Sequence, residues 1–328
     1  MAAADVLVVS LGSTAGLRAA DAALAGALRR AGAHVEVAAA RPPRELRTYA
    51  LTDLAWARAA RVAARAGIVA HDPRAIVYST TTAALLWPRP GAIRFDAPSA
   101  ANRPGRHGVW QRPLERRRLR AAPLLVPWDA TSLAETPRPH ADAIVVPMAV
   151  APSSATGAAR DLTAITYAAN PHKKGLDRVL SAWAQARTRD EQLVVAGADL
   201  RLGDLAGVTV AGRLAPAEYR ALLRRARVFV TAPRREDYGI AQLEALADGC
   251  LLVTTAAPGP YAALPLARAL DPRLVAADAD GLAAALRIAL DDPAPGYARR
   301  AAAALAPFAP DAVDAAVRDE LLPRLLGT

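Results

Sequence analysis

The chain has 328 residues and a formal net charge of +10, and it is 53% hydrophobic but only 5% aromatic. This length predicts two compact domains. No apolar run reaches the roughly 20 residues of a membrane-spanning helix, and the start of the chain lacks the basic and apolar regions of a signal peptide, so we expect a cytoplasmic protein. One cysteine, Cys250, excludes an internal disulfide and is expected in the core.

Strands and helices alternate in the first half of the chain. An apolar strand at Val6–Val9 leads through the turn Gly12–Gly16 into a helix at Leu17–Ala31, and a second strand follows at His34–Val37. The later patterns predict a helix at Asp53–Ala66 and strands at Ala75–Tyr78, Ala92–Phe95, Leu124–Val126 and Ile144–Val146. Such βαβ alternation predicts a parallel sheet that binds ligands at the carboxyl ends of its strands.

Proline, serine and glycine interrupt the alternation at Pro147–Gly157, which is the best domain boundary. The second half predicts strands at Thr163–Tyr167, Gln192–Ala196, Val208–Ala211, Val228–Thr231 and Leu251–Thr255. It also predicts helices at Leu176–Ala186, Ala215–Arg225, Gly239–Ala247, Gly281–Leu290 and Asp311–Leu326. We therefore expect an α/β protein with two Rossmann-like domains, 1–150 and 151–328, that face a cleft.

The loop before the helix Gly239–Ala247 carries the strongest chemical pattern. Glu236 belongs to that loop, and Glu244 lies about two turns into the helix. A ligand there would meet the loop carboxylate, the N–H groups at the start of the helix and the positive end of its dipole, which favour a phosphate between hydroxyl-binding groups. The alternative is that Glu236 and Asp237 cap the helix and Glu244 is solvated.

The segment 228–253, with its Glu-x7-Glu spacing, resembles the signature of the family 4 retaining glycosyltransferases, which have a GT-B fold. Further landmarks occur in the order that this family has. They are the Lys-Gly loop Pro171-His-Lys-Lys-Gly175, the strands Leu193–Gly197 and Val208–Arg213, the hinge entry Val145-Val-Pro147, and Gly16 followed by Gly32. The resemblance implies a glycosyltransferase with an acceptor domain first, a nucleotide-sugar domain second, and a C-terminal helix that returns to the first domain.

The resemblance also implies roles for individual residues. Glu236 would contact the transferred sugar, Glu244 would hold the ribose hydroxyls, and Lys174 would pair with the diphosphate. The other residues implied to bind the donor are Lys173, Gly239, Ile240 and Gly16. The donor would be a nucleotide sugar, most simply linked to UDP or GDP, and no further cofactor is implied. Retention would proceed by front-side attack with no dedicated protein nucleophile.

Some positions depart from the family pattern. Ala168-Ala169 stand where the family usually has an arginine, for which Arg213, Arg234 or Arg235 is a candidate replacement, and Ala15 replaces the first glycine of the usual pair. The later Gly-Gly-x-x-Glu pattern is reduced to Pro258-Gly-Pro-Tyr261. These departures leave open a degenerate homologue that acts as a binding or scaffold subunit. A nicotinamide enzyme is disfavoured, because Gly12-Ser-Thr-Ala-Gly16 does not match Gly-x-Gly-x-x-Gly.

Weaker signals concern metals and the first domain. Asp278-Ala-Asp280 matches an Asp-x-Asp metal motif, but its place before a helix favours capping, and no His/Cys cluster has metal spacing. We therefore expect no metal. Asp96, after the strand at Ile93, is a candidate for acceptor binding. His107 is a candidate for a contact with the sugar, although loop histidines are usually solvated.

Positive charge gathers in the first half, where residues 1–150 hold 20 Arg against 11 acidic residues. The segment Arg103–Arg120 alone has seven Arg and one Glu, with Trp110 and aliphatic residues interleaved. This pattern is typical of a peripheral contact with an anionic membrane face, and it fits a lipid-linked acceptor, while a saccharide acceptor stays open. A solvated Arg-rich surface is the alternative. No nucleic-acid motif appears, so we expect no nucleic-acid partner.

Overall fold

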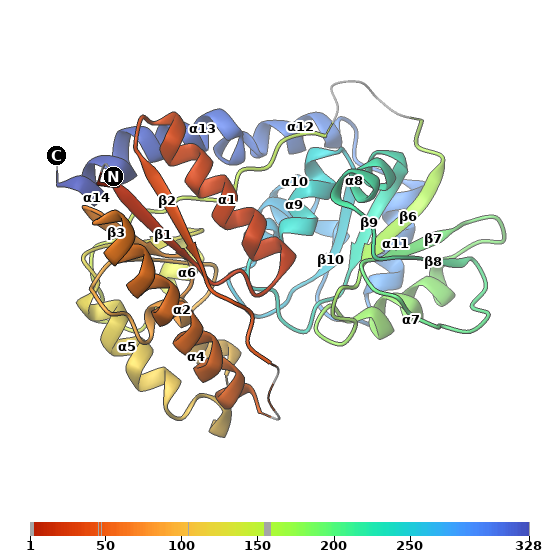
Figure 1. The fold of residues 1–328 in the computed structure, drawn as a ribbon. Helices are drawn as coiled ribbons and strands as arrows, with labels where there is room; N and C mark the ends of the chain where they lie inside the picture. The colour runs from red at the N-terminus through yellow and green to blue at the C-terminus, as the bar shows by residue number, and fades with distance from the viewer. Residues whose placement is uncertain (1–2, 45, 47, 104, 154–158, 328) are drawn as a thin grey trace. The chain divides into compact units, whose positions relative to one another are not determined.

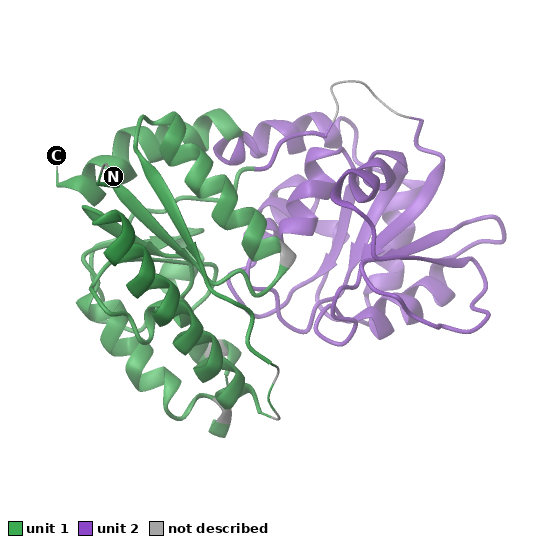
Figure 2. Cartoon of the chain, viewed as in Figure 1, with its two compact units in different colours: residues 1–149, 310–328 green, residues 150–309 purple. Residues whose placement is uncertain are grey.

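The computed structural model describes residues 3–44, 46, 48–103, 105–153 and 159–327. Two compact units make up the chain (Figure 2). The first unit is residues 1–149 with 310–328, and the second unit is residues 150–309. The division near residue 150 lies within the expected boundary segment, of which residues 154–158 are outside the described part. The C-terminal segment belongs to the first unit, so the expected range 151–328 extends past the second unit.

The first unit is built on a five-stranded parallel sheet with the order β2-β1-β3-β4-β5 (Figure 1). Its strands are β1 (Val6–Ser10), β2 (Val35–Ala39), β3 (Ala75–Tyr78), β4 (Ala92–Phe95) and β5 (Leu125–Pro127). Its longer helices are α1 (Ala15–Arg30), α2 (Tyr49–His71) and α5 (Gln111–Ala121), and its short helical turns are α3 (Thr81–Ala84), α4 (Ser99–Asn102), η1 (Gly105–Gly108) and α6 (Ala130–Ala134).

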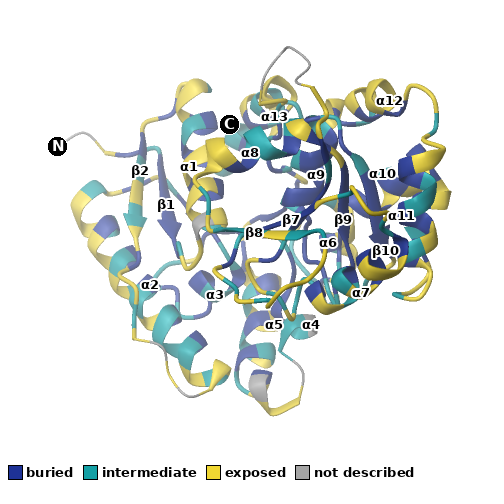
Figure 3. Ribbon diagram, turned by 90° about the vertical axis from the view of Figure 1, so that its right-hand side faces the viewer, coloured by how far each residue is buried: buried dark blue, intermediate teal, exposed yellow. Residues whose placement is uncertain are grey.

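Alternation along β1 places helices on both faces of this sheet. Val6 and Val8 pack in one apolar cluster with Leu28 of α1, whereas Leu7 and Val9 pack in the other with alanines of α2. Neighbouring strand residues point to opposite faces, so a strand covered on both sides needs apolar residues throughout. Figure 3 shows the result as a fully buried β1 between helices whose outer faces are exposed.

The C-terminal segment completes the first apolar cluster. It consists of α13 (Pro310–Ala316), the π-helical turn η4 (Val317–Leu321) and α14 (Leu322–Leu326). Val313, Val317 and Leu321 are buried against α1 and β1, and Arg30 of α1 donates two hydrogen bonds to the carboxylate of Asp314, at 2.6 and 2.7 Å. The expectation that the C-terminal helix returns to the first domain is confirmed.

The second unit contains a six-stranded parallel sheet with the order β11-β10-β9-β6-β7-β8. Its strands are β6 (Leu162–Tyr167), β7 (Leu193–Ala196), β8 (Val208–Gly212), β9 (Ala226–Thr231), β10 (Leu251–Thr255) and β11 (Val275–Ala276). Its helical segments are α7 (Leu176–Ala186), α8 (Pro216–Arg225), α9 (Ile240–Ala247), α10 (Ala263–Leu270), η2 (Pro272–Leu274), α11 (Leu282–Asp291), α12 (Tyr297–Ala304) and η3 (Ala306–Phe308). Both units are therefore Rossmann-like, as expected.

Each sheet has one point at which the chain reverses the direction in which it adds strands. In the first unit this point lies between β1 and β3, and in the second it lies between β6 and β9. The loops that follow such neighbouring strands diverge to opposite faces and leave a crevice at the carboxyl ends, where open parallel sheets bind their ligands. The topology thus marks one candidate position in each unit.

Two element predictions need correction. Ile144–Val146 is not a ladder strand: the segment runs beside β5 and donates from Ile144 and Val146 to carbonyls of that strand, but only one isolated bridge forms, between Leu125 and Ala143. The helix predicted at Asp53–Ala66 is longer, because Thr48 caps it through a 3.3 Å bond from Leu51 N–H and it continues to His71. No helix in the described part of the chain is long and apolar enough to cross a bilayer.

Candidate functional site

A buried ion pair occupies the crevice position of the second unit. The side chain of Glu236 is 5% exposed, and its Oε2 accepts hydrogen bonds from Nζ of Lys174 at 2.6 Å and from Nε2 of Gln242 at 2.9 Å. Lys174 lies in the loop after β6, and Glu236 lies in the loop after β9. These are the two neighbouring strands at the reversal point. The structure therefore brings the two predicted residues together at the carboxyl edge where a ligand is expected.

Two glycines allow these loops to approach the neighbouring backbone. Gly175 has φ +63°, and a Cβ there would lie 1.9 Å from the carbonyl oxygen of Ala232. Gly259 has φ +109°, and its Cβ would lie 2.2 Å from the carbonyl oxygen of Glu236. Both contacts are with backbone, which cannot turn aside as a flexible side chain can. Only glycine combines these conformations with these close approaches.

The second lysine of the pair forms its own ion pair beside the first. Nζ of Lys173 lies 2.5 Å from Oδ2 of Asp237, and Nε of Arg235 donates to Oδ1 of the same carboxylate at 2.8 Å. Burial alone would raise the pKa of Asp237, but the charges of Lys173 and Arg235 and their hydrogen bonds hold it below its usual value. Lys173 is 40% exposed, compared with 19% for Lys174. The two lysines therefore differ in environment, and Lys174 is the more buried of the two.

Helix α9 begins directly after this loop. Its N-cap, Gly239, has φ +90°, and a Cβ there would lie 3.1 Å from the ring of Tyr261. Tyr261 is fully buried with φ +40°, and its hydroxyl lies 2.6 Å from Oγ1 of Thr254. The ring of Tyr261 therefore packs against the start of α9. The first N–H groups of a helix lack intrahelical partners and carry partial positive charge, so Gly239 and Ile240 present the positive end of α9 near Glu236.

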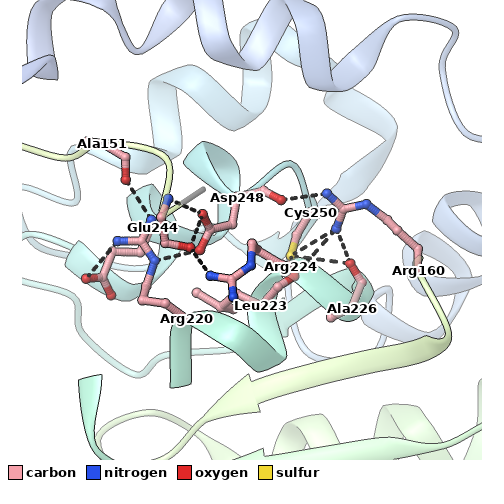
Figure 4. A network of polar contacts seen from close by, with 10 residues as sticks. Ala151, Arg160, Arg220, Leu223, Arg224, Ala226, Glu244, Asp248 and Cys250 are labelled. Carbon is pink, nitrogen blue, oxygen red and sulfur yellow. Dashed lines mark hydrogen bonds and ion pairs between the residues drawn. The ribbon is translucent and has the colours of Figure 1, made fainter. Parts of the chain in front are cut away.

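Glu244 joins a charge network between α8 and α9 (Figure 4). Nη1 of Arg220 lies 3.6 Å from Oε1 of Glu244, and Nε of Arg220 donates to Oδ2 of Asp248 at 2.6 Å. The remaining nitrogen of the guanidinium donates to the carbonyl of Ala151 at 2.7 Å. Burial raises the pKa of Glu244 and the Asp248 carboxylate raises it further, although Arg220 opposes both. One arginine therefore links Glu244 to the segment that enters the second unit.

The same network anchors that entering segment. Asp248 is buried and accepts from both N and Oγ of Ser153, at 2.8 and 2.9 Å. Its carbonyl oxygen accepts from Arg160 at 2.5 Å, and Arg160 also donates to the carbonyl of Ala226. Cys250 is buried beside this arginine, and burial raises the pKa of its thiol to about 12. The prediction that Cys250 is a core residue is confirmed.

Three arginines that are candidates to replace the missing family arginine have carboxylate partners of their own. Arg213 lies 3.6 Å from Asp199 and is 78% exposed, at the end of the edge strand β8. Arg234 forms a two-bond pair with Asp177, at 2.7 and 2.8 Å, and Arg235 is the partner of Asp237 described above. The structure therefore does not place Arg213 in the Lys174–Glu236 cluster.

Of the residues predicted in the first unit, Asp96 lies in a cavity near the reversal point of the sheet. Asp96 follows β4 and lines a cavity with residues that follow β1 and β3. Gly16 lies in the first turn of α1, where an added Cβ would meet nothing closer than 4.0 Å, so packing within the protein does not require a glycine there. The backbone of His107 belongs to η1, and its side chain is outside the described part of the structure.

The Asp-x-Asp pattern forms a turn just before a helix. Oδ1 of Asp278 accepts hydrogen bonds from the N–H groups of Asp280 and Gly281, at 3.0 and 3.1 Å, just before α11. The N-cap of α11 is Gly281, without a side-chain cap bond, so the expectation that an aspartate of this pattern caps the helix is wrong: Asp278 stabilises the turn before it. Among the described residues, no group of three or more His, Cys, Asp or Glu side chains could hold a metal ion.

Sequence reasoning missed four residues that support the site. Gln242 shares the carboxylate of Glu236, Gly259 and Tyr261 support the loop and the start of α9, and Arg220 holds Glu244. The Pro258–Tyr261 segment was noted only as a departure from the family pattern, yet the N–H of Glu236 donates to the carbonyl of Pro258 at 3.1 Å. The Pro-Gly-Pro run at residues 258–260 is the sequence feature that could have indicated this supporting role.

Residues 162–292 match the family described as glycosyl transferases group 1, and no curated protein matches the sequence. Solved structures match nearly the whole chain. WaaG, a glycosyltransferase involved in lipopolysaccharide biosynthesis, superposes with a TM-score of 0.74 at 15% identity, covering 98% of this chain and 100% of WaaG. Sucrose-phosphate synthase from Thermosynechococcus elongatus gives 0.72 at 15%, covering 94% and 96%. HepE from Anabaena, solved with UDP and glucose, gives 0.67 at 15%, covering 97% and 99%.

These structural matches establish the GT-B fold across both units, and the family match falls on the unit that contains Lys174, Glu236 and Glu244. Residues 162–292 of the second unit are therefore a glycosyltransferase domain of the group 1 family, also called family 4.

Proposed function

We propose that the protein is a retaining glycosyltransferase that moves a hexose-type sugar from a UDP- or GDP-linked donor to a saccharide or lipid-linked acceptor. The observation that carries this proposal is the Lys174–Glu236 pair, buried at the reversal point of the second sheet. A carboxylate and an ammonium held there match the two halves of the donor, which are a sugar rich in hydroxyls and an anionic diphosphate. The solved relative HepE was crystallised with UDP and glucose.

In this proposal each atom of the pair has its own task. Both hydrogen bonds that described residues make to the Glu236 side chain end on Oε2, so Oε1 is the oxygen that would accept a hydroxyl of the donor sugar. The ammonium of Lys174 has three N–H donors, and only one is directed at Glu236. The other two would bind the diphosphate and neutralise the charge that develops as it leaves.

The start of α9 and the residue two turns along it would hold the rest of the donor. The N–H groups of Gly239 and Ile240 would donate to a phosphate oxygen, as helix N-termini do. Glu244 would accept the ribose hydroxyls, and Arg220 would keep its carboxylate in place. In this proposal the donor charge is balanced by Lys174 and the helix end without a metal ion. The first unit would bind the acceptor.

A nucleotide-sugar panel tests donor binding and separates the enzyme from a degenerate homologue. We expect UDP-glucose, GDP-mannose or ADP-glucose to raise the melting temperature by several degrees, since a ligand at 100 times its Kd stabilises the native state by about 2.7 kcal/mol. Glu244→Gln should weaken that binding about tenfold, as expected for a lost hydrogen bond to a charged acceptor. Glu320→Gln, an exposed position on η4, is the matched control.

The outcomes of this panel are distinct. Binding with donor hydrolysis or transfer supports the enzyme, whereas binding without either supports a scaffold role, to which the alanines at 168 and 169 point. If no nucleotide sugar shifts the melting temperature, both proposals fail.

We also propose that helix α5 contacts an anionic membrane face. Three of the seven arginines in Arg103–Arg120 are committed to the protein: Arg103 pairs with Asp53 at 2.7 Å, Arg112 donates to the carbonyl of Gly105 at 2.8 Å, and Arg118 donates to that of Leu85 at 2.9 Å. The exposed members are Arg106, Arg116, Arg117 and Arg120, and Val109 beside them is 66% exposed. An apolar residue among exposed cations is the combination that an anionic bilayer surface attracts.

Cosedimentation with vesicles tests this surface. The wild type should bind vesicles that contain phosphatidylglycerol and not vesicles of phosphatidylcholine alone. Replacing Arg116, Arg117 and Arg120 by Gln should weaken binding more than tenfold, because each charge near the surface contributes about 1 kcal/mol. The control replaces three exposed arginines of the second unit, Arg189, Arg201 and Arg299. Equal losses in the two triple variants would show that net charge, not α5, governs binding.

A further inference from the structure

Three charged side chains of the second unit lie in contact between α8 and α9 (Figure 4). Their exposure decreases in order: the side chain of Glu244 is 27% exposed, that of Arg220 is 15% exposed, and that of Asp248 is 1% exposed. Glu244 and Asp248 are four residues apart at the end of α9, so they lie on one face of that helix, and Arg220 reaches both from α8. The most accessible group is therefore a carboxylate, and the most buried is another.

Asp248 is held in place by the segment through which the chain enters the second unit. Its Oδ1 accepts hydrogen bonds from N and Oγ of Ser153, at 2.8 and 2.9 Å, and its Oδ2 accepts from Nε of Arg220 at 2.6 Å. Ser153 is fixed in turn, because Nη1 of Arg224 donates to its Oγ at 2.6 Å. Both oxygens of the buried carboxylate are thus bonded, and their donors come from two separate segments.

Arg220 is fixed by two hydrogen bonds that do not involve Glu244. Its Nε donates to Asp248, and its Nη2 donates to the carbonyl of Ala151 at 2.7 Å. Burial alone would lower the pKa of Arg220, but the hydrogen bond and charge of Asp248 and the charge of Glu244 raise it. Because a guanidinium is rigid and planar, fixing two of its nitrogens also fixes the third. The position of Nη1 is therefore set before any ligand binds.

Glu244 is oriented by this nitrogen and keeps its capacity to bind a ligand. Nη1 of Arg220 lies 3.6 Å from Oε1 of Glu244, which is too long for a hydrogen bond. Within the described part of the chain, no hydrogen bond ends on the Glu244 carboxylate. The cation also offsets the repulsion between two carboxylates that are four residues apart on a helix. Glu244 is therefore held by charge while its oxygens stay able to accept hydroxyl groups.

We propose that Asp248 is a positioning residue that makes the donor site selective for ribonucleotides over nucleotides without ribose hydroxyls. Acting through Arg220, it fixes the Glu244 carboxylate in advance at the place where the ribose hydroxyls meet it. A site built to bind a hydroxyl rejects an analogue without one, because its polar group is then left unpaired. The place of Glu244 at the ribose rests on the function proposed above.

Calorimetric titration of the full chain with UDP, GDP and ADP, and with the 2′,3′-dideoxy form of each, tests this assignment without turnover. The readout is the ratio of the two dissociation constants for one base. We expect the wild type to bind one of the ribonucleotides about 10²-fold more tightly than its dideoxy form, since two hydrogen bonds to a charged acceptor are lost.

Asp248→Asn should lower this ratio to about tenfold, by weakening the ribonucleotide and leaving the dideoxy form nearly unchanged. Asparagine keeps an oxygen for Ser153, but its amide N–H groups face Nε of Arg220, so the guanidinium loses its anchor. A general defect of folding would weaken both nucleotides alike and would leave the ratio as it was.

A second variant and a matched control accompany this one. Arg220→Lys keeps the charge but has one nitrogen in place of three, so the ratio should fall in the same way. Asp161→Asn is the control, because Asp161 accepts two hydrogen bonds from Arg225 of the same helix α8, at 2.9 and 2.8 Å, and both side chains are about half exposed. It removes a carboxylate–arginine pair without touching Glu244. Circular dichroism shows which variants are folded.

Each result has one meaning. A ratio that falls in Asp248→Asn and Arg220→Lys but not in Asp161→Asn supports the assignment, and Arg220→Lys decides alone if Asp248→Asn does not fold. Equal losses of both nucleotides, or unchanged affinities, overturn the role of Asp248. If the wild type binds a ribonucleotide and its dideoxy form equally, Glu244 does not hold the ribose, and this inference fails while the transferase proposal keeps its Lys174–Glu236 pair. If none of the three ribonucleotides binds, the proposed function fails as well.

Discussion

Replacing Lys174 by Met is expected to lower the rate of sugar transfer by about 10²- to 10³-fold, which is the typical cost of removing one preorganised charge that meets developing negative charge. Methionine keeps the length of the side chain and removes the ammonium. Nζ of Lys174 lies 2.6 Å from Glu236 in a site where the lysine is 19% exposed and the glutamate 5%. In such an environment a charge is worth far more than it is in water.

Removing one partner also leaves the other without its charge. In Lys174→Met the Glu236 carboxylate keeps, among the described residues, the hydrogen bond from the amide of Gln242, at 2.9 Å, and a buried charge that loses its partner is costly. We expect the free energy of unfolding to fall by about 1–3 kcal/mol, which leaves a folded protein whose kinetics can be measured. Glu236→Gln should lower the transfer rate to a similar extent, because its amide nitrogen would face the donors of Lys174 and Gln242.

The double variant is the sharpest test of this pair. Residues that act as a unit give losses that are much smaller together than the product of the single losses. Lys174→Met with Glu236→Gln should therefore transfer at a rate close to that of the slower single variant, measured as kcat with saturating donor. Arg201→Met removes an exposed cation of the same unit and serves as the control. Multiplicative losses would mean that the two side chains act independently, contrary to the proposed division of the donor between them.

Inner strands such as β1 and β9 were predictable because they are largely buried on both faces and read as nearly continuous apolar runs, whereas the edge strands β2 and β8 are partly exposed. Val6–Val9 and Val228–Thr231 appear within a residue or two of β1 and β9. Ile144–Val146 has the same apolar signal, but its neighbour β5 is only three residues long, and the one isolated bridge there joins Leu125 to Ala143, just before the segment. The local sequence of a segment carries no information about the length of the strand with which that segment must pair.

The residues of the site likewise fall into those that the sequence predicted and those that only the structure revealed. Lys174 and Glu236 were found because each lies in a short local motif, and the sheet topology then explains why the two motifs meet. Gln111 of α5 gave no signal, because its complete burial with no hydrogen-bond partner among the described residues is a property of the packed unit. Arg220 likewise became visible only through the distances that join it to Glu244, Asp248 and Ala151.

Gly259→Ala is expected to disable the site by displacing the backbone of Glu236. Gly259 has φ +109°, and the new Cβ would stand 2.2 Å from the carbonyl oxygen of Glu236. A side chain at such a φ costs about 1–3 kcal/mol, and relieving the clash must move the peptide that carries Glu236. A displacement of about 1 Å in a catalytic group can cost about 10²-fold in rate. We therefore expect a transfer rate lower by about 10²-fold and a free energy of unfolding lower by about 3 kcal/mol.

Gly203→Ala separates the two causes. Gly203 has φ +65° in the same unit, and an added Cβ there would meet nothing within 4 Å. It therefore carries the conformational cost, about 1–2 kcal/mol, without the clash and without any contact to Glu236. Urea unfolding and initial rates measured on both variants give the comparison. If Gly259→Ala lost no more activity than Gly203→Ala, the Pro258–Tyr261 segment would not be what holds the carboxylate of Glu236 in position, and the support for this loop would have to come from Lys174 and Gln242 alone.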